Sequence, residues 1–354
     1  MARLFARSIA TRKLSIWDRI PIISHFRKSV GVQRGMLVFG LVLTAIFLLT
    51  AAFAPLIAPY SFNTLRDENG LFGAQNPPSA EHIWGTTVGG YDVFSRVVWG
   101  AQTAFAVIVV AVLLSIFAGI LLGLVSGYFG GWLDRVLVVI CDSIYAFPSL
   151  LLAIVMSIVI SGGQSNLWGG ILAAAISITV VFIPQYFRVI RAETVRIKAE
   201  AFVESAKVIG VSNSRIMFRH VLRNATRTLP LIFTLNASEA ILTLAGLGFL
   251  GFGIEPSEAA EWGFDLNKSL ADVTSGIWWT SVFPGFAIVL AVLGITLVGE
   301  SLSELGDPRL RGRKAVGIAH EEVAVPTVLP GGAVVAGTPG VSMRPDTPGT
   351  EVRP

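Results

Sequence analysis

The stretch TAFAVIVVAVLLSIFAGILLGL, residues 103–124, contains no charged side chain. A helix needs about 20 mostly apolar residues to cross the roughly 30 Å hydrocarbon core of a bilayer. This stretch therefore predicts a membrane-spanning helix. The whole chain agrees, because 53% of its 354 residues are hydrophobic and only 14% are charged, whereas soluble domains carry about 25% charged residues.

Five further apolar stretches of similar length lie before and after it. The predicted spans are 36–57, 103–124, 135–160, 169–187, 231–253 and 278–299. They divide the chain into a basic N-terminal segment (1–35), a first span (36–57), a segment at 58–102, a five-helix core (103–311) and a tail (312–354). The tail is rich in Pro, Gly, Val and Thr without a helical period, so we expect it to be disordered.

Lys and Arg are divided unevenly among the connecting segments. Eight lie in 1–35, nine in 188–230 and six after the last span, which leaves only four of the 27 elsewhere. Segments 58–102 and 254–277 carry acids instead, such as Asp67, Glu255 and Asp272. The positive-inside bias then places both termini and the 188–230 loop in the cytoplasm. The predicted fold is an all-α membrane bundle of six spans.

The 188–230 loop contains two short amphipathic helices. Phe202, Val203, Ala206 and Ile209 recur at helical spacing within 199–209. Gly210 suits the left-handed position that ends a helix, and Ser212 is a plausible N-cap for the next one. Such an apolar loop predicts a docking surface for another protein.

The second helix places apolar residues on one side and basic residues on another. Ile216, Met217, His220 and Val221 share one side, and Arg215, Arg219 and Arg223 share the other. A DNA-binding helix-turn-helix has a similar pattern. We expect no nucleic-acid binding, because the segment is tethered between membrane helices and no dimerisation domain is visible.

The run Glu204-Ser205-Ala206, followed by Gly210, Ile216 and Leu229-Pro230, resembles the EAA loop of permeases of binding-protein-dependent ABC importers. The middle alanine of the family pattern is Ser205 here. In that family the loop forms a coupling helix that fits a groove on the ATPase subunit. The resemblance implies docking contacts among Glu204, Ser205, Ala206, Gly210, Ile216, Arg219 and His220.

Other segments are similar to the dipeptide and oligopeptide group, C-type subunits in particular. They are His82–Thr86, Asp92–Arg96 with Gly100, Phe147–Leu152, Pro184 with Tyr186 and Arg188, Phe249–Gly253, Trp262-Gly263, Phe283–Gly285 and Asp307–Arg311. The group usually shows Gly-Thr-Asp and Gly-Arg-Asp where this chain has Gly85-Thr86-Thr87 and Gly90-Tyr91-Asp92. Those departures bear on substrate range or on docking of a binding protein.

The resemblance implies a multi-pass subunit of the bacterial inner membrane that imports di- or oligopeptides. It also implies a second permease, two ATP-binding subunits and an extracytoplasmic substrate-binding protein as partners. The expected mechanism is alternating access, driven by ATP and Mg in the partner subunits.

Enzyme chemistry is not expected in this chain. It has no G-x-x-x-x-G-K-[ST] phosphate loop and no Gly-x-Ser-x-Gly or His-Glu-x-x-His motif. Its four histidines are scattered, and its single cysteine, Cys141, lies in an apolar stretch, so we expect neither a metal site nor a cofactor. Asp142 and Glu239 lie within or near spans, where acids are candidate pathway residues. A hydrogen-bonded structural role is the favoured interpretation of both.

Three alternatives stay open at this point. The first is the same kind of importer with another cargo, such as nickel or glutathione. The second is an ion-coupled secondary transporter, which would need broken helices and internal repeats. The third is a membrane-anchored structural or regulatory protein without an ATPase partner.

Overall fold

A computed structural model describes residues 32–68, 70–161, 167–306, 327–328 and 334–335. The chain divides into two compact units, 1–306 and 307–354. In the second unit the described residues form β3 (Thr327–Val328) and β4 (Val334–Val335), which pair antiparallel. The rest of the tail that we predicted to be disordered lies outside the described residues, as do residues 1–31 of the basic segment.

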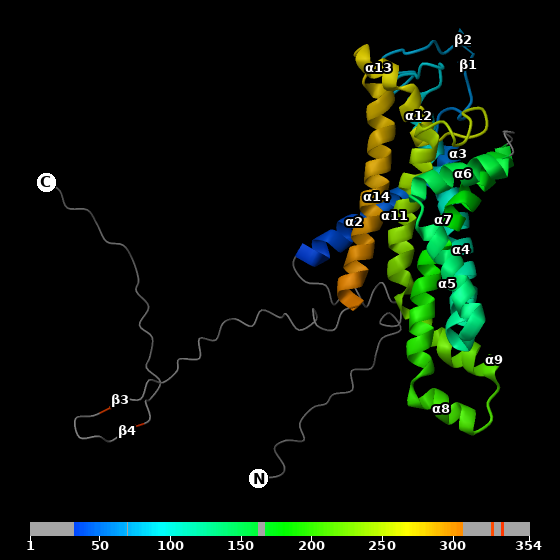
Figure 1. The fold of residues 1–354 in the computed structure, drawn as a ribbon. Coiled ribbons are helices and arrows are strands. Elements are labelled where there is room, and N and C mark those ends of the chain that lie inside the picture. Colours follow the sequence, from blue (N-terminus) through cyan, green and yellow to red (C-terminus); the bar gives the residue numbers. More distant parts are fainter. Residues whose placement is uncertain (1–31, 69, 162–166, 307–326, 329–333, 336–354) are drawn as a thin grey trace. The chain divides into compact units, whose positions relative to one another are not determined.

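The first unit is a bundle of long helices that match the predicted spans (Figure 1). The helices that each could cross a membrane are α2 (Val32–Ala52), α4 (Val93–Phe129), α7 (Leu167–Lys198), α11 (Leu229–Phe249) and α14 (Trp279–Gly306). Helices α5 (Gly131–Tyr145) and α6 (Ser149–Ser161) pass the same test as a pair, bent by 99°. With that pair taken as one broken span, the described part of the chain has the six predicted spans.

The third span is not the single helix over 135–160 that hydropathy predicts. Pro148 disfavours a helical conformation at Phe147 and has no N–H to donate. Helix α5 therefore ends at Tyr145, and α6 begins at Ser149. The N–H of Leu152 donates to the Pro148 carbonyl at 3.0 Å. The chain thus turns sharply at membrane level.

Several helix ends differ from the prediction because hydropathy marks only the apolar part of a helix. Helix α4 starts at Val93, ten residues before the predicted span, where the Asp92 carboxylate accepts the Ser95 N–H at 2.7 Å. Helix α7 runs on to Lys198, so residues 188–198 are helical and not part of the loop. The first span breaks after Ala52, and the short helix α3 (Ala54–Ile57) follows it.

Helices α4 and α7 approach closely through three glycines at four-residue spacing on α4. A Cβ at Gly119 would lie 2.3 Å from Tyr186 Cβ, and one at Gly123 would lie 2.7 Å from the Phe187 carbonyl oxygen. At Gly127 the distance to the Arg191 carbonyl oxygen would be 2.8 Å. Small residues permit such close packing of membrane helices, so this contact is the dense centre of the bundle.

The remaining elements gather at the two ends of the bundle (Figure 1). We call residues 58–92 and 250–278 the cap. It holds β1 (Arg66–Asp67), β2 (Gly70–Leu71), α12 (Trp262–Lys268) and α13 (Leu270–Thr274). We call residues 199–225 the knob. It holds α8 (Ala201–Val208), α9 (Asn213–Arg215), the π-helical turn η2 (Ile216–Val221) and α10 (Leu222–Ala225), which the 3₁₀ turn η3 (Thr226–Thr228) joins to α11.

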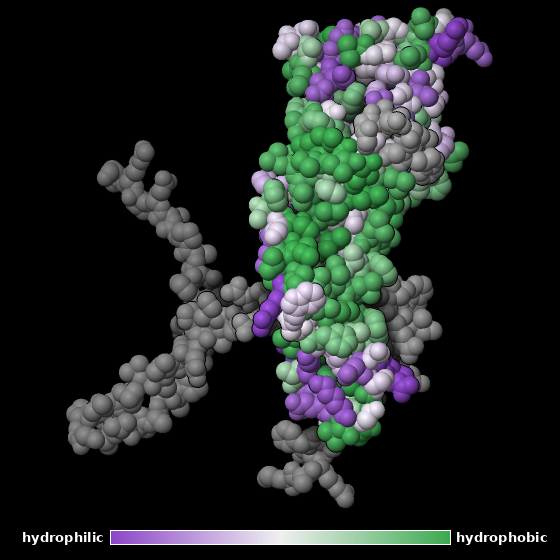
Figure 2. Space-filling model, turned by 45° about the vertical axis from the view of Figure 1, so that its right-hand side comes forward, coloured by the Kyte–Doolittle hydropathy of each residue, from purple (hydrophilic) through white to green (hydrophobic). Residues whose placement is uncertain are grey.

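Figure 2 shows a broad apolar band on one face of the bundle, with hydrophilic residues concentrated toward its two ends. This distribution is expected of helices that cross a hydrocarbon layer with their ends in the two aqueous phases. The cap and the knob therefore lie on opposite sides of the membrane.

Candidate functional site

The knob is organised by a tight turn at Gly210. Gly210 has φ +80°, in the left-handed region where glycine is favoured. Its N–H donates to the Lys207 carbonyl at 3.0 Å, and the Val211 N–H donates to the Ala206 carbonyl at 3.0 Å. These two bonds form a Schellman motif, which satisfies the free carbonyls at a helix end. The predicted role of Gly210 as the helix-ending residue is confirmed.

Helix α8 buries only part of its apolar surface. Val203 is fully buried and Ala206 is partly buried, which ties α8 to the bundle. Phe202 is 46% exposed, Val208 87% and Ile209 78%. The predicted amphipathic helix is thus present, and neighbouring elements cover only part of its apolar side. The tip of the knob presents bare apolar side chains.

The second half of the knob packs against α8 and is hydrogen-bonded to the end of α4. Ser212 precedes α9 with an extended backbone, as an N-cap residue should, but its side chain makes no capping hydrogen bond within the described residues. Ile216, Met217 and Val221 are buried. The Tyr128 hydroxyl at the end of α4 donates to Asn213 Oδ1 at 2.9 Å, and the Lys198 ammonium donates to the Tyr128 carbonyl.

The structure places most of the predicted docking residues on the surface of the knob. Glu204, Ser205, Gly210 and Arg219 are exposed, and Ala206 and His220 are partly buried. Ile216 is fully buried, so its side chain supports the knob from within and has no surface for a partner. Val208 was missing from the predicted set. Its apolar character at the end of α8, next to Gly210, is the signal that could have identified it.

A buried ion pair joins α12 of the cap to α4. Arg96 and Asp265 are 1% and 7% exposed, and Arg96 Nε lies 2.8 and 2.9 Å from the two Asp265 oxygens. The guanidinium also donates to the Phe62 carbonyl at 3.1 Å. Glu261 caps α12 by accepting the N–H groups of Gly263 and Phe264 at 2.8 and 2.7 Å. Burial raises the pKa of Glu261 to about 8, and these N–H groups oppose that rise.

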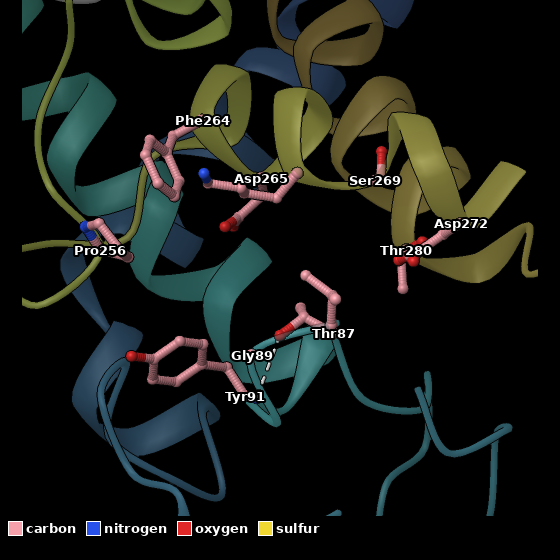
Figure 3. A pocket seen from close by; sticks show the side chains of 11 residues that line it. Thr87, Gly89, Tyr91, Pro256, Phe264, Asp265, Ser269, Asp272 and Thr280 are labelled. Carbon is pink, nitrogen blue, oxygen red and sulfur yellow. Dashed lines mark hydrogen bonds between the residues drawn. The ribbon is translucent and has the colours of Figure 1, made fainter. Parts of the chain in front are cut away.

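A second feature of the cap is a pocket of about 200 Å³ between the 87–91 loop and α12 (Figure 3). Thr87 and Tyr91 line it from the loop, joined by a hydrogen bond from the Tyr91 N–H to the Thr87 hydroxyl at 3.1 Å. Asp272 lines it from α13. Its Oδ1 accepts a hydrogen bond from Gln75 Nε2 at 2.5 Å. Thr87 and Tyr91 stand where the chain departs from the dipeptide and oligopeptide pattern.

The segments that carry the resemblance in the cap pack on one another. His82 Nδ1 lies 3.0 Å from Asp92 Oδ1, and both side chains are buried. The Trp262 indole donates to the Val97 carbonyl at 2.9 Å, and a Cβ at Gly100 would lie 2.3 Å from its Nε1. These contacts hold the cap against α4.

Two protein-family models match the chain. One describes a binding-protein-dependent transport system inner membrane component and matches residues 119–312. The other describes the N-terminal TM domain of oligopeptide transport permease C and matches residues 33–78. The first match includes the knob and the second includes α2.

Curated bacterial proteins match over most of the chain. A dipeptide transport system permease protein of Alkalihalophilus pseudofirmus is 37% identical over 296 residues, covering 83% of this chain and 93% of that protein. A glutathione transport system permease protein of Escherichia coli O157:H7 is 36% identical over 267 residues, covering 75% and 84%. The corresponding glutathione permease of Pectobacterium atrosepticum is 32% identical over 305 residues, covering 86% and 94%.

Proposed function

Because this chain belongs to the binding-protein-dependent transport system inner membrane components, as an ABC importer permease of the dipeptide and oligopeptide family, we propose that it carries di- or oligopeptides across the bacterial inner membrane. The observation that supports this cargo is the 37% identity to a dipeptide permease over 83% of the chain. Glutathione is the second candidate cargo, because glutathione permeases match at 32–36% identity.

The proposed orientation places the knob in the cytoplasm and the cap outside. The knob and the adjoining end of α7 carry exposed basic residues, such as Arg196, Arg215 and Arg219. The cap is mainly acidic, with Glu255 and Glu258 near Asp265 in sequence. This distribution agrees with the positive-inside bias.

The proposed assembly contains a second permease, two ATP-binding subunits and an extracytoplasmic substrate-binding protein. ATP and Mg would be bound by the ATP-binding subunits, and the knob would dock on one of them. Closure of the ATPase pair would displace the knob. The bundle would then change between inward-open and outward-open states, since a driven change needs a contact that differs between them.

The contacts of the knob allow a displacement of it to be transmitted to the membrane helices. Buried Val203 and the Schellman turn keep α8 in one orientation. Tyr128 ties Asn213 to the end of α4, and Lys198 ties the same tyrosine to α7. A displacement of the knob therefore acts directly on the two helices that pack most closely through glycines.

Reversing the charge of Glu204 should weaken ATPase docking. Glu204→Lys changes an exposed side chain in the first turn of α8, so folding of the permease should be unaffected. We expect about tenfold weaker retention of the ATPase, equivalent to roughly 1.4 kcal/mol, in co-purification through a tag on this chain. Glu255→Lys makes the same change on the cap and should retain the ATPase fully. Undiminished retention by Glu204→Lys would exclude this residue as a contact.

The bare apolar tip of the knob should contribute more to docking than Glu204. Burying one Val or Ile side chain stabilises a contact by about 1.5–3 kcal/mol, so the double change Val208→Ser with Ile209→Ser should reduce ATPase retention more than tenfold. Both side chains are over three-quarters exposed, so the isolated permease should keep its thermal stability. Val88→Ser, at a 44% exposed valine of the cap, is the matched control. Equal retention by the double variant and the control would show that this tip is not the docking surface.

The experiment that tests the cargo begins with purification in mild detergent through a tag on this chain. Mass spectrometry should identify a second permease and ATP-binding subunits. The complex, reconstituted in nanodiscs with its binding protein, should then hydrolyse ATP faster with a dipeptide than with glutathione. Stimulation by glutathione alone would assign the second cargo. A homo-oligomer without an ATPase, under conditions that preserve a control ABC complex, would contradict the proposed assembly.

A further inference from the structure

Glu239 is a partly exposed carboxylate in the middle of a membrane span. It lies ten residues from both ends of α11 (Leu229–Phe249), which is about 15 Å at 1.5 Å per residue. An acid at the centre of a bilayer is energetically unfavourable if it faces lipid. The side of α11 that carries Glu239 must therefore face protein or water.

The surroundings of Glu239 do not explain it as a structural residue. Among the residues that the structure describes, no side chain lies within ion-pair distance of its carboxylate and none hydrogen-bonds to it. The backbone carbonyl of Glu239 accepts the Thr243 hydroxyl at 2.9 Å. Within the described residues, the hydrogen-bonded structural role favoured from the sequence therefore has no partner group for the Glu239 carboxylate.

Glu239 lines a recess of about 200 Å³ at the bend between α5 and α6. The other polar side chains of this recess are Gln185 of α7, Ser149 at the start of α6 and Tyr145 at the end of α5. The break at Pro148 brings the C-terminal end of α5 and the N-terminal end of α6 to the same place. These two helix ends carry opposite partial charges, so the net charge of the recess depends on the Glu239 carboxylate.

A second polar group lies beside this recess. Arg188, one turn beyond Gln185 on α7, pairs with Asp142 of α5 at 3.0 Å, and both side chains are about half exposed. The Arg188 guanidinium also lies 4.2 Å from the centre of the Tyr145 ring. Asp142 thus has the paired role expected of it, and its charge offsets that of Arg188. Tyr145 therefore contacts both this ion pair and the recess.

We propose that Glu239 is the ammonium-binding position in the wall of the transport pathway, with Gln185, Ser149 and Tyr145 around it. A peptide in transit carries a primary ammonium group at its N-terminus, and it can carry another on a lysine side chain. The carboxylate supplies the opposite charge, while the amide and the hydroxyls replace water around the ammonium. This inference rests on the proposed peptide cargo, and it applies equally to glutathione, which also has a free ammonium.

The test measures the local charge first and the ligand second. Ser149→Cys places a thiol at the recess, and Ser275→Cys places one at an exposed position of the cap. The parent chain is the blank, since its single cysteine, Cys141, is 2% exposed. The assembled complex in nanodiscs is treated with a trimethylammonium-ethyl or a sulfonatoethyl methanethiosulfonate, and the two labelling rates are compared.

The ratio of cationic to anionic labelling should be about tenfold higher at Ser149→Cys than at Ser275→Cys, because a charged cleft concentrates counter-ions at least tenfold. Adding Glu239→Gln should lower the ratio to the Ser275→Cys value, and Glu239→Asp should restore part of it. If adding Glu239→Gln left the labelling ratio at Ser149→Cys unchanged, the inference would be overturned and the proposed cargo would stand. Absence of labelling by either reagent would overturn it too, because that face would then be covered by lipid or protein.

The second measurement uses three peptides at millimolar concentration as competitors of labelling at Ser149→Cys. Protection by trialanine alone would assign the N-terminal ammonium. Protection by trialanine and by N-acetyl-Ala-Lys-Ala would support a site for either ammonium. Equal protection by N-acetyl-trialanine would overturn the ammonium assignment. A charge ratio as expected with protection by no peptide would overturn it as well and would count against the peptide cargo.

Discussion

Replacing Gly210 by valine should reduce peptide uptake about 5- to 30-fold while the chain still inserts and accumulates in the membrane. Gly210 has φ +80°, and a left-handed conformation costs a residue with a Cβ about 1–2 kcal/mol, with more expected for a β-branched one. That energy changes the population of the native turn by about the stated factor. Uptake of a labelled peptide in a strain that carries only this variant provides the measurement.

A matched substitution separates the turn from the volume of the side chain. Among the residues that the structure describes, no heavy atom lies within 4 Å of a Cβ built at Gly210, so valine meets no steric obstacle there and the expected effect is conformational. Asparagine tolerates the left-handed region, so Gly210→Asn should keep most of the uptake. Equal loss in both variants would indicate that the glycine is needed for close contact with the ATPase. Normal uptake by Gly210→Val would show that the turn does not transmit coupling.

The number of spans could be predicted from the sequence, but the shape of the third span could not. Hydropathy depends on composition alone, and residues 135–160 are apolar whether the helix is straight or broken. Pro148 indicates a boundary, yet the 99° angle depends on what α6 packs against. Ser157 of α6, for example, donates a hydrogen bond to the Phe252 carbonyl at 3.1 Å, 95 residues away in sequence.

The turn of the knob was predictable for a local reason, and its surface was not. A glycine after an amphipathic helix predicts a left-handed turn, because the bonds of the motif join residues three to five apart. Which apolar residues are covered depends on distant parts of the chain. Val203 is buried and Val208 is exposed, although both belong to the same short helix, because the rest of the knob covers only one side of α8.

The surroundings of Glu239 could not be predicted either, because they too depend on distant parts of the chain. Sequence alone allows an intramembrane acid to be paired or unpaired, because its partner can lie on any other helix. Asp142 has Arg188 as its partner across 46 residues, whereas Glu239 faces a recess built from three segments. Hydropathy does not distinguish Asp142 from Glu239, whereas their surroundings in the fold do.

Replacing Arg96 by methionine should destabilise the cap more than any other single change considered for this chain. Asp265 would remain buried without its ion-pair partner, and breaking a buried pair on one side costs about 3–5 kcal/mol. The Phe62 and Pro256 carbonyls, at 3.1 and 3.5 Å from Arg96 Nη1, would lose a donor as well. We expect the thermal midpoint of the detergent-purified permease to fall by about 10 °C, measured by fluorescence-detected size-exclusion chromatography after heating.

A second variant tests whether the unpaired charge of Asp265 causes the loss of thermal stability. Asp265→Asn added to Arg96→Met removes the charge without changing the shape of the side chain at 265, and it should recover at least half of the lost midpoint. The thermal midpoint of Arg96→Lys should lie between those of the unmodified permease and Arg96→Met. An ammonium cannot approach both oxygens of Asp265 and the Phe62 carbonyl as the guanidinium does. If the double variant were as unstable as Arg96→Met, packing of the arginine stem between α4 and α12 would be the main contribution, and the ion pair would serve only to orient it.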